Sequence, residues 1–349
     1  MAISIRLLQP QEAELANNFF NTIYGTARSH ENFRWEFLEG PCGKAIYVVA
    51  VDDAVTANTK IVGIQCAIPL ELISTKGQIV LTAKSEDTLV DPSYRGQKVF
   101  ERMYDLLFKE CEKAGIKYIW GFTPAQKAFE RIGFEIPFSA QQTLLVLKPF
   151  QAYTYLKSLN KENKAIDKFK IFGLCLLSWI KQFKTFFGKN AALTNTSLEG
   201  KNDLFQKFYG DTPLFTLNET PAYVNWRIKK NPFHNKYESY QSANHDVDVI
   251  LNFRGNIGYI EQILSKNDGA IKQLIPAMIR KFRSEKTGLV RTLSFSSNST
   301  LTSQIDSLSA AGFTYLKRGN YFVWKSLTQE RLIEPHQLFI TRLFAQGNL

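Results

Sequence analysis

Cysteine and histidine are scarce in this sequence, whose 349 residues include only four of each. The cysteines, at positions 42, 66, 111 and 175, are widely spaced and mostly embedded in apolar runs. This pattern predicts reduced thiols in a packed core and argues against a disulfide framework. The histidines show no spacing typical of a metal site, so we expect no bound metal.

Several motifs of common enzyme classes are missing too. The sequence has no Ser/His/Asp nucleophile elbow and no Walker phosphate loop. Residues 1–6 lack the pattern of a signal peptide, and the longest apolar run has about ten residues, against the roughly 20 that span a bilayer. These features predict a cytoplasmic protein.

Positive charge is in excess, with a net charge of +11 at pH 7. Such an excess indicates an anionic partner (a nucleotide, CoA, a nucleic acid or a lipid headgroup) or simply favours solubility. The basic residues are dispersed and match no nucleic-acid-binding motif, so no nucleic acid is expected. The length suits two domains, and 44% hydrophobic residues suffice for packed cores.

The most informative segment is residues 90–100, Val-Asp-Pro-Ser-Tyr-Arg-Gly-Gln-Lys-Val-Phe. It follows a strand-like run at 79–89 and precedes a helix-like run at 100–115. A strand that turns into a helix N-terminus binds anions well, because unpaired N–H groups and the helix dipole point at the ligand. The turn also carries Arg95, Gly96 and Lys98, which favours a phosphate ligand.

This segment resembles the pyrophosphate loop of the GNAT acetyltransferase superfamily, including its Pro-x-Tyr-Arg-Gly lead-in. Lys98 and Phe100 stand where the family has its two loop glycines, and Ala128–Phe134 resembles its helix-to-strand Gly-Phe signature. The resemblance implies that acetyl-CoA is the co-substrate. The residues that it assigns to acyl-CoA are Leu89, Val90, Arg95, Gly96, Gln97, Lys98, Val99 and Phe100.

An internal repeat predicts two such domains. Residues 33–41, which contain Trp35, resemble residues 224–232, which contain Trp226, and a Gly-Phe pair follows in each half. We therefore predict an α+β fold of two tandem GNAT-like domains, each a mixed, mostly antiparallel sheet flanked by helices. The expected boundaries are 1–150, with the acyl-CoA loop, and 202–349, which is degenerate because residues 264–270 make a poor phosphate cradle.

Residues 151–201 form a basic amphipathic linker between the two halves. Lysines flank an apolar face in 168–187 that includes Phe169, Trp179 and Phe183. Two interpretations stay open: an interfacial helix on an anionic membrane, and a helix packed across both domains. The second is favoured because the apolar run is short and Gly173 and Ser178 interrupt it.

Family resemblance also places the catalytic base on the strand that leads into the loop. By strand alternation, Lys84, Glu86, Thr88 and Val90 share one face, and Asp87 and Leu89 share the other. Glu86 is thus the first candidate for the base and Asp87 the second. Phe129 stands where the family often has a tyrosine acid, so Tyr118, Tyr94 or water would have to donate the proton.

Aromatic and basic residues near the repeats are candidates for lining an acceptor cleft: Trp35, Trp226, Arg227 and Tyr237. The predicted function is an acetyl-CoA-dependent N-acyltransferase acting on a small amine. Resemblance to tandem GNAT proteins suggests an amino sugar or a nucleotide-linked sugar as that amine. The alternative is a non-catalytic GNAT-fold protein that binds CoA or acts as a scaffold.

Overall fold

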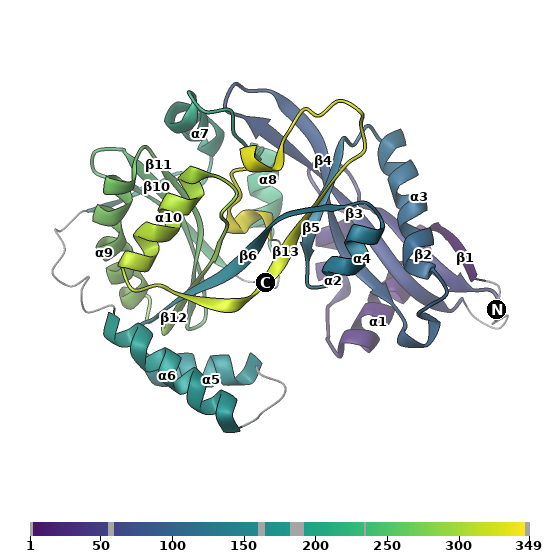
Figure 1. The fold of residues 1–349 in the computed structure, drawn as a ribbon, viewed down its shortest axis with the longest axis horizontal. Coiled ribbons are helices and arrows are strands. Elements are labelled where there is room, and N and C mark those ends of the chain that lie inside the picture. The colour runs from purple at the N-terminus through teal and green to yellow at the C-terminus, as the bar shows by residue number, and fades with distance from the viewer. Residues whose placement is uncertain (1–2, 55–58, 160–164, 182–191, 234, 346–349) are drawn as a thin grey trace.

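The computed structural model describes residues 3–54, 59–159, 165–181, 192–233 and 235–345 (Figure 1). One 13-stranded sheet runs through the whole molecule, in the order β1-β2-β3-β4-β5-β13-β6-β12-β11-β10-β9-β7, with β8 paired to β3. Helices cover the sheet in both halves. The first half contains β1 Ile3–Leu7, α1 Ala13–Tyr24, α2 His30–Phe37, β2 Ile46–Asp52, β3 Ile61–Ser74, β4 Ile79–Val90, α3 Val99–Lys113, β5 Tyr118–Thr123, α4 Gln126–Arg131 and β6 Glu135–Val146.

Two helices, α5 Pro149–Leu159 and α6 Ala165–Lys181, connect the halves. The second half contains β7 Leu193–Thr196, α7 Lys201–Tyr209, β8 Phe215–Leu217, α8 Pro221–Val224, β9 Lys236–Ser242, β10 Val247–Arg254, β11 Ile257–Ser265, α9 Asp268–Ser284, β12 Leu289–Ser294, α10 Ser299–Ala310 and β13 Thr314–Ser326. Single helical turns at Asn225–Lys229 and Arg342–Phe344 complete it.

The two halves repeat one topology. In the first, β3 and β4 are antiparallel, α3 follows, and β5 pairs in parallel with β4. In the second, β10, β11, α9 and β12 are arranged in the same way. The two parallel pairs are short, Thr82–Lys84 against Tyr118–Trp120 and Ile257–Tyr259 against Leu289–Arg291.

Strands from the two halves interleave at the centre of the sheet. The last strand of the chain, β13, lies between β5 and β6, and β6 in turn pairs with β12 (Figure 1). Each half therefore supplies strand partners to the other, and one sheet continues across the junction.

The repeated tryptophans meet at the junction of the halves. The Trp35 indole N–H donates to the Trp226 carbonyl at 2.8 Å, and the Trp226 indole N–H donates to the Trp35 carbonyl at 2.7 Å. The two rings stack with their centroids 5.4 Å apart. This reciprocal arrangement is what an approximate two-fold relation between the repeats produces, and both rings are buried.

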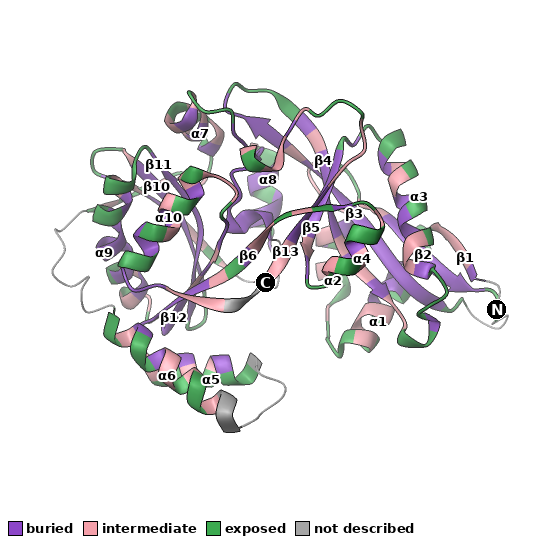
Figure 2. Ribbon diagram, viewed as in Figure 1, coloured by how far each residue is buried: buried purple, intermediate pink, exposed green. Residues whose placement is uncertain are grey.

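The linker helices lie below β12, on the side of the second half (Figure 1). Ala152, Leu156 and Cys175 join a core with Val146 of β6 and Tyr259 of β11, so the hairpin contacts strands of both halves. The opposite side of α6 is exposed (Figure 2) and carries Phe169, Phe172, Leu176, Leu177 and Ile180. Phe183 and Lys184, expected on this segment, lie outside the described residues. Within the described ranges, no helix is both long and apolar enough to cross a membrane.

A leucine-to-alanine substitution should affect the free energy of unfolding differently on the two sides of the hairpin. Leu156 is 8% exposed and Leu177 is 61% exposed. We expect Leu156→Ala to lower the free energy of unfolding by about 2–5 kcal/mol, because it leaves a cavity against β6 and β11. Leu177→Ala should change it by less than about 0.5 kcal/mol. Chemical denaturation measures both, and equal effects would contradict the packing.

Candidate active site

A cavity of about 680 Å³ opens where β4 and β5 separate. The two strands pair from Thr82 to Lys84, and the residues that follow on each, 85–88 and 121–124, line opposite walls of the cavity. Beyond Lys84 the edge of β4 that faces β5 has no strand partner. The remaining lining residues come from α1, α2 and the segment between them, from α4 and β13, and from Phe233.

A β-bulge changes which side chains of β4 reach this cavity. Asp87 has a φ of 49°, and the register with β3 shifts, so that Asp87 and Thr88 together oppose Gln65. The Ser85 and Thr88 hydroxyls both contact the Tyr104 hydroxyl on α3, at 2.8 and 3.2 Å. The simple alternation expected from the sequence is therefore wrong here. Asp87 lies on the same face as Glu86, because the bulge inserts one residue into the strand.

Asp87 is fully engaged by its neighbours. Its two oxygens accept hydrogen bonds from Arg28 at 2.9 and 2.8 Å, and the Tyr47 hydroxyl donates a third bond at 2.8 Å. Burial is the largest single effect and lowers the pKa of the Arg28 guanidinium, but the charge and hydrogen bonds of Asp87, with smaller contributions from Tyr47 and Glu36, together shift it upward. Burial, reinforced by the Asp87 charge, raises the pKa of Tyr47 well above its ordinary value. This network of three hydrogen bonds fixes the position of the Asp87 carboxylate.

Glu86 faces the cavity beside a buried lysine. Its carboxylate forms an ion pair with Lys84, whose side chain is only 1% exposed. The Glu86 side chain is 32% exposed, so one side of its carboxylate remains open to the cavity. The pair places a carboxylate in the cavity and compensates a lysine charge that burial alone would disfavour.

Glu36, on α2, is a cavity residue that the sequence did not single out. Burial raises the pKa of its carboxyl group to about 7, and repulsion from Glu86 and Asp87 adds to that shift, whereas Lys84 and Arg28 oppose it. A carboxyl group with such a pKa exchanges its proton near neutral pH, as a general base requires. The sequence gives no signal for this role beyond the repeat that contains Glu36, because its carboxylate neighbours come from a distant strand.

The predicted acyl-CoA loop forms an open anion cradle. Gly96 has a φ of 81° with no atom near the position of a Cβ, and Lys98, at the family's first loop glycine, keeps a glycine-like φ of 58°. No side chain caps α3 at Lys98, so the N–H groups of the first turn, from Val99 onward, are available to a ligand. Arg95, Gly96, Gln97 and Lys98 are exposed.

The corresponding features of the second half are blocked. The Asn267 side chain caps α9 by accepting from the Ala270 N–H at 2.9 Å, and Asp268 adds a negative charge to its first turn. Only about 30 Å³ remains where β11 and β12 separate, because Ile340 to Arg342 and α10 line that space. There Glu261, at the position that matches Glu86, pairs with Arg342 at 2.5 Å.

The other residues predicted from the sequence lie elsewhere. Tyr118 is buried, and its hydroxyl accepts the N–H groups of Leu332 and Ile333 at 2.7 and 3.0 Å. Neither Tyr118 nor the Trp35–Trp226 pair lines the β4–β5 cavity. Arg227 and Tyr237 line a second cavity, in the other half. The structure thus brings together Glu86 and Asp87, and does not bring Tyr118, Trp35, Trp226, Arg227 or Tyr237 to them.

Comparison with known proteins bears on the first half and on the fold as a whole. Residues 4–136 match the family model described as "Acetyltransferase (GNAT) domain". No curated protein matches the sequence.

Solved structures match nearly the whole chain. A GCN5-related N-acetyltransferase from Anabaena variabilis is 14% identical over 94% of this chain and 73% of its own, with a TM-score of 0.60. N-myristoyltransferase from Saccharomyces cerevisiae, solved with myristoyl-CoA, is 14% identical over 93% and 79%, with a TM-score of 0.57. A tandem GNAT protein from the clavulanic acid biosynthesis pathway is 10% identical over 94% and 100%, with a TM-score of 0.53. These likenesses confirm the predicted α+β fold of two tandem GNAT-like domains.

The loop can be tested with two nearly isosteric substitutions at Gly96. Asparagine tolerates a positive φ better than most residues, so Gly96→Asn controls for backbone strain at φ 81°. Gly96→Asp adds a negative charge where the amides point. We expect Gly96→Asp to weaken acetyl-CoA binding at least about tenfold relative to Gly96→Asn, by calorimetry. Equal acetyl-CoA affinities in the two folded variants would show that the loop does not bind acetyl-CoA.

The raised pKa of Glu36, about 7, makes stability depend on pH. Between about pH 4.5 and 7 the folded protein keeps a proton that the unfolded chain releases, so the free energy of unfolding falls as the pH rises. Glu36→Gln removes this loss. Relative to the wild type, the variant should gain about 1–3 kcal/mol between pH 4.5 and pH 8, measured by denaturation at each pH. A difference that does not change with pH would contradict the assigned pKa.

Proposed function

Because the chain carries a GNAT acetyltransferase domain within a tandem GNAT fold, we propose that it transfers the acetyl group of acetyl-CoA to a small amine. One observation carries this proposal: a single strand, β4, connects the carboxylate-lined cavity to the open anion cradle. Strand β4 contributes Glu86 and Asp87 to the cavity and then leads into the loop at Arg95 and Gly96.

The residues of the first half fit acyl-CoA. The uncapped first turn of α3 and the exposed side chains of Arg95 and Lys98 would hold the pyrophosphate. The unpaired edge of β4, which includes Leu89 and Val90, offers backbone groups to the pantetheine arm. When bound there, the co-substrate supplies a thioester carbonyl as the electrophile.

Glu36 is the general base of this proposal. An amine entering the cavity is protonated in water, and the carboxylates Glu36, Glu86 and Asp87 attract the cation. The protonated amine must then lose a proton to act as a nucleophile. Glu36, with a pKa of about 7, is matched to this step, whereas the Glu86 carboxylate is already engaged in an ion pair with Lys84. Glu86 acts through its charge, which raises the pKa of Glu36.

The acceptor in this proposal is a small primary amine, with an amino sugar or a nucleotide-linked sugar as the specific candidates. The volume of about 680 Å³ is large enough for a sugar-sized acceptor beside the acyl group. Phe20, Phe122 and Phe233 provide apolar walls, and the carboxylates provide the polar end. A cationic amine that has an apolar or ring-like body matches both surfaces.

The pH–rate profile distinguishes the two candidate bases. In Glu36→Gln we expect turnover to fall about a hundredfold or more, and the acidic limb of the profile, near pH 7, to disappear. In Glu86→Gln the limb should persist and move to lower pH, because a neighbouring negative charge is gone. If Glu86→Gln is the change that removes the limb, then Glu86 is the base.

The assay also tests the proposed function itself. Acetyl-CoA with a panel of amines, including amino sugars, should give acetylated product and free CoA. Acetyl-CoA binding with no turnover on any amine would favour the non-catalytic alternative.

A further inference from the structure

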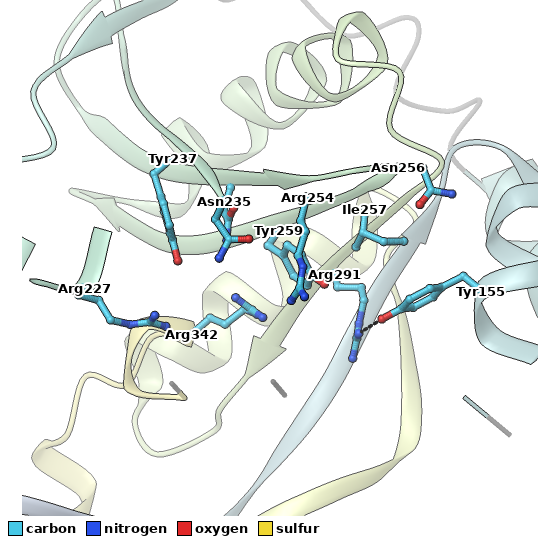
Figure 3. A pocket seen from close by; sticks show the side chains of 11 residues that line it. Tyr155, Arg227, Asn235, Tyr237, Arg254, Asn256, Ile257, Tyr259, Arg291 and Arg342 are labelled. Carbon is cyan, nitrogen blue, oxygen red and sulfur yellow. Dashed lines mark hydrogen bonds between the residues drawn. The ribbon is translucent and has the colours of Figure 1, made fainter. Parts of the chain in front are cut away.

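A second cavity, of about 380 Å³, lies in the second half and is lined by four arginines (Figure 3). Arg227 comes from the helical turn Asn225–Lys229, Arg254 from β10, Arg291 from β12 and Arg342 from the turn Arg342–Phe344. In Figure 3 their guanidinium groups lie along the cavity, next to one another. No acidic residue is among the described residues that line it; the others are Tyr155, Asn235, Tyr237, Asn252, Asn256, Ile257 and Tyr259.

Arg227 is the most unusual of the four. It is 2% exposed, its Nε is buried without a hydrogen-bond partner, and no described residue forms an ion pair with it. A buried guanidinium with an unsatisfied N–H and no direct ion pair is costly in a folded protein. The side chain faces the cavity beside Arg342 (Figure 3), so an anion there would supply the missing partner.

Two of the other arginines are already fixed in place. Arg291 donates to the Tyr155 hydroxyl at 2.6 Å and to the Gln142 side chain at 2.8 Å, both neutral groups. Arg342 pairs with Glu261 and lies 4.1 Å from the centre of the Tyr259 ring. These contacts hold the guanidinium groups before any ligand arrives, which lowers the entropic cost of binding.

The number of arginines without an ion pair indicates a ligand with more than one negative charge. Glu261 pairs with Arg342, but among the described residues no carboxylate forms an ion pair with Arg227, Arg254 or Arg291. A single carboxylate would neutralise one of three cations. A phosphate or diphosphate brings two or more negative charges and accepts paired hydrogen bonds from the planar guanidinium group.

We propose that this arginine cavity is a binding site for a phosphate-bearing small molecule, separate from the acyl-CoA loop and independent of the proposed acetyl transfer. The buried position of Arg227 and the volume of about 380 Å³ suit a compact ligand rather than a nucleic-acid backbone. Tyr237 and Tyr155 line the same cavity and offer hydroxyl and ring contacts to the rest of the molecule.

The internal repeat supports this division of roles. Arg227 follows Trp226 as Glu36 follows Trp35, so the two residues hold the same position in the two repeats. In the first half that position carries an acid in a cavity suited to a cationic amine. In the second half it carries an arginine in a cavity suited to an anion. Phe233 lines the first cavity, and the centre of its ring lies 5.5 Å from the guanidinium group of Arg254, which lines the second.

Calorimetry with inorganic diphosphate tests the site. The titration is made with saturating CoA present, so that the loop of the first half is occupied. We expect one diphosphate to bind, and Arg227→Met to weaken that binding at least tenfold. Arg254→Met should weaken it too, and because Arg254 is exposed, folding of this variant is not at risk.

Arg95→Met is the matched control, since it removes the same charge from the acyl-CoA loop. It should leave diphosphate affinity unchanged while weakening CoA, a result that holds whether or not the protein transfers acetyl groups. The proposal is overturned if diphosphate does not bind, or if its affinity responds to Arg95→Met and not to Arg227→Met or Arg254→Met. Equal binding of a dicarboxylate such as malonate would overturn the assignment to phosphate.

Discussion

The candidate active site depends on the early separation of two parallel strands. Strands β4 and β5 share only the pairing from Thr82 to Lys84, and from there their facing edges are free. The cavity occupies the opening, and the unpaired edge of β4 continues to the anion cradle at α3. The separation is tolerated because β13 satisfies the other edge of β5 and β3 satisfies the other edge of β4. A cavity for ligands is thus built without disrupting the sheet.

The two halves share this framework and differ in what fills it. Glu86 and Glu261 hold matching positions, but Glu86 borders open space, whereas Arg342 from the end of the chain pairs with Glu261 and helps to fill the second opening. The cap of α9 by Asn267 removes the second anion cradle. We infer that the second half does not hold acyl-CoA and has a different, anion-binding role through Arg227 and its neighbours.

The loop and the repeat could be read from the sequence because each is a local pattern. The pair Arg95-Gly96 indicates a turn by its own sequence, and the segments around Trp35 and Trp226 can be recognised as a repeat by comparing them with each other. The insertion of β13 between β5 and β6 could not be predicted, because pairing between strands some 190 residues apart leaves no pattern in the local sequence. The sequence predicts a regular alternation along this strand, and the bulge at Asp87 breaks it. The bulge depends on hydrogen bonds from Arg28 and Tyr47, which lie far from Asp87 in the sequence and so could not be foreseen. The raised pKa of Glu36 comes from burial and from charges on a distant strand, and the arginine cavity is assembled from four separate segments, so neither leaves a pattern in the local sequence.

Backbone amide exchange on adding acetyl-CoA tests the central claim most directly, namely that acyl-CoA binds at the uncapped helix of the first half alone. Exchange should slow over residues 96–101, at the start of α3, and stay unchanged over residues 267–270, at the start of α9. Unchanged exchange at 96–101, or slowing at 267–270 instead, would contradict this account of the site.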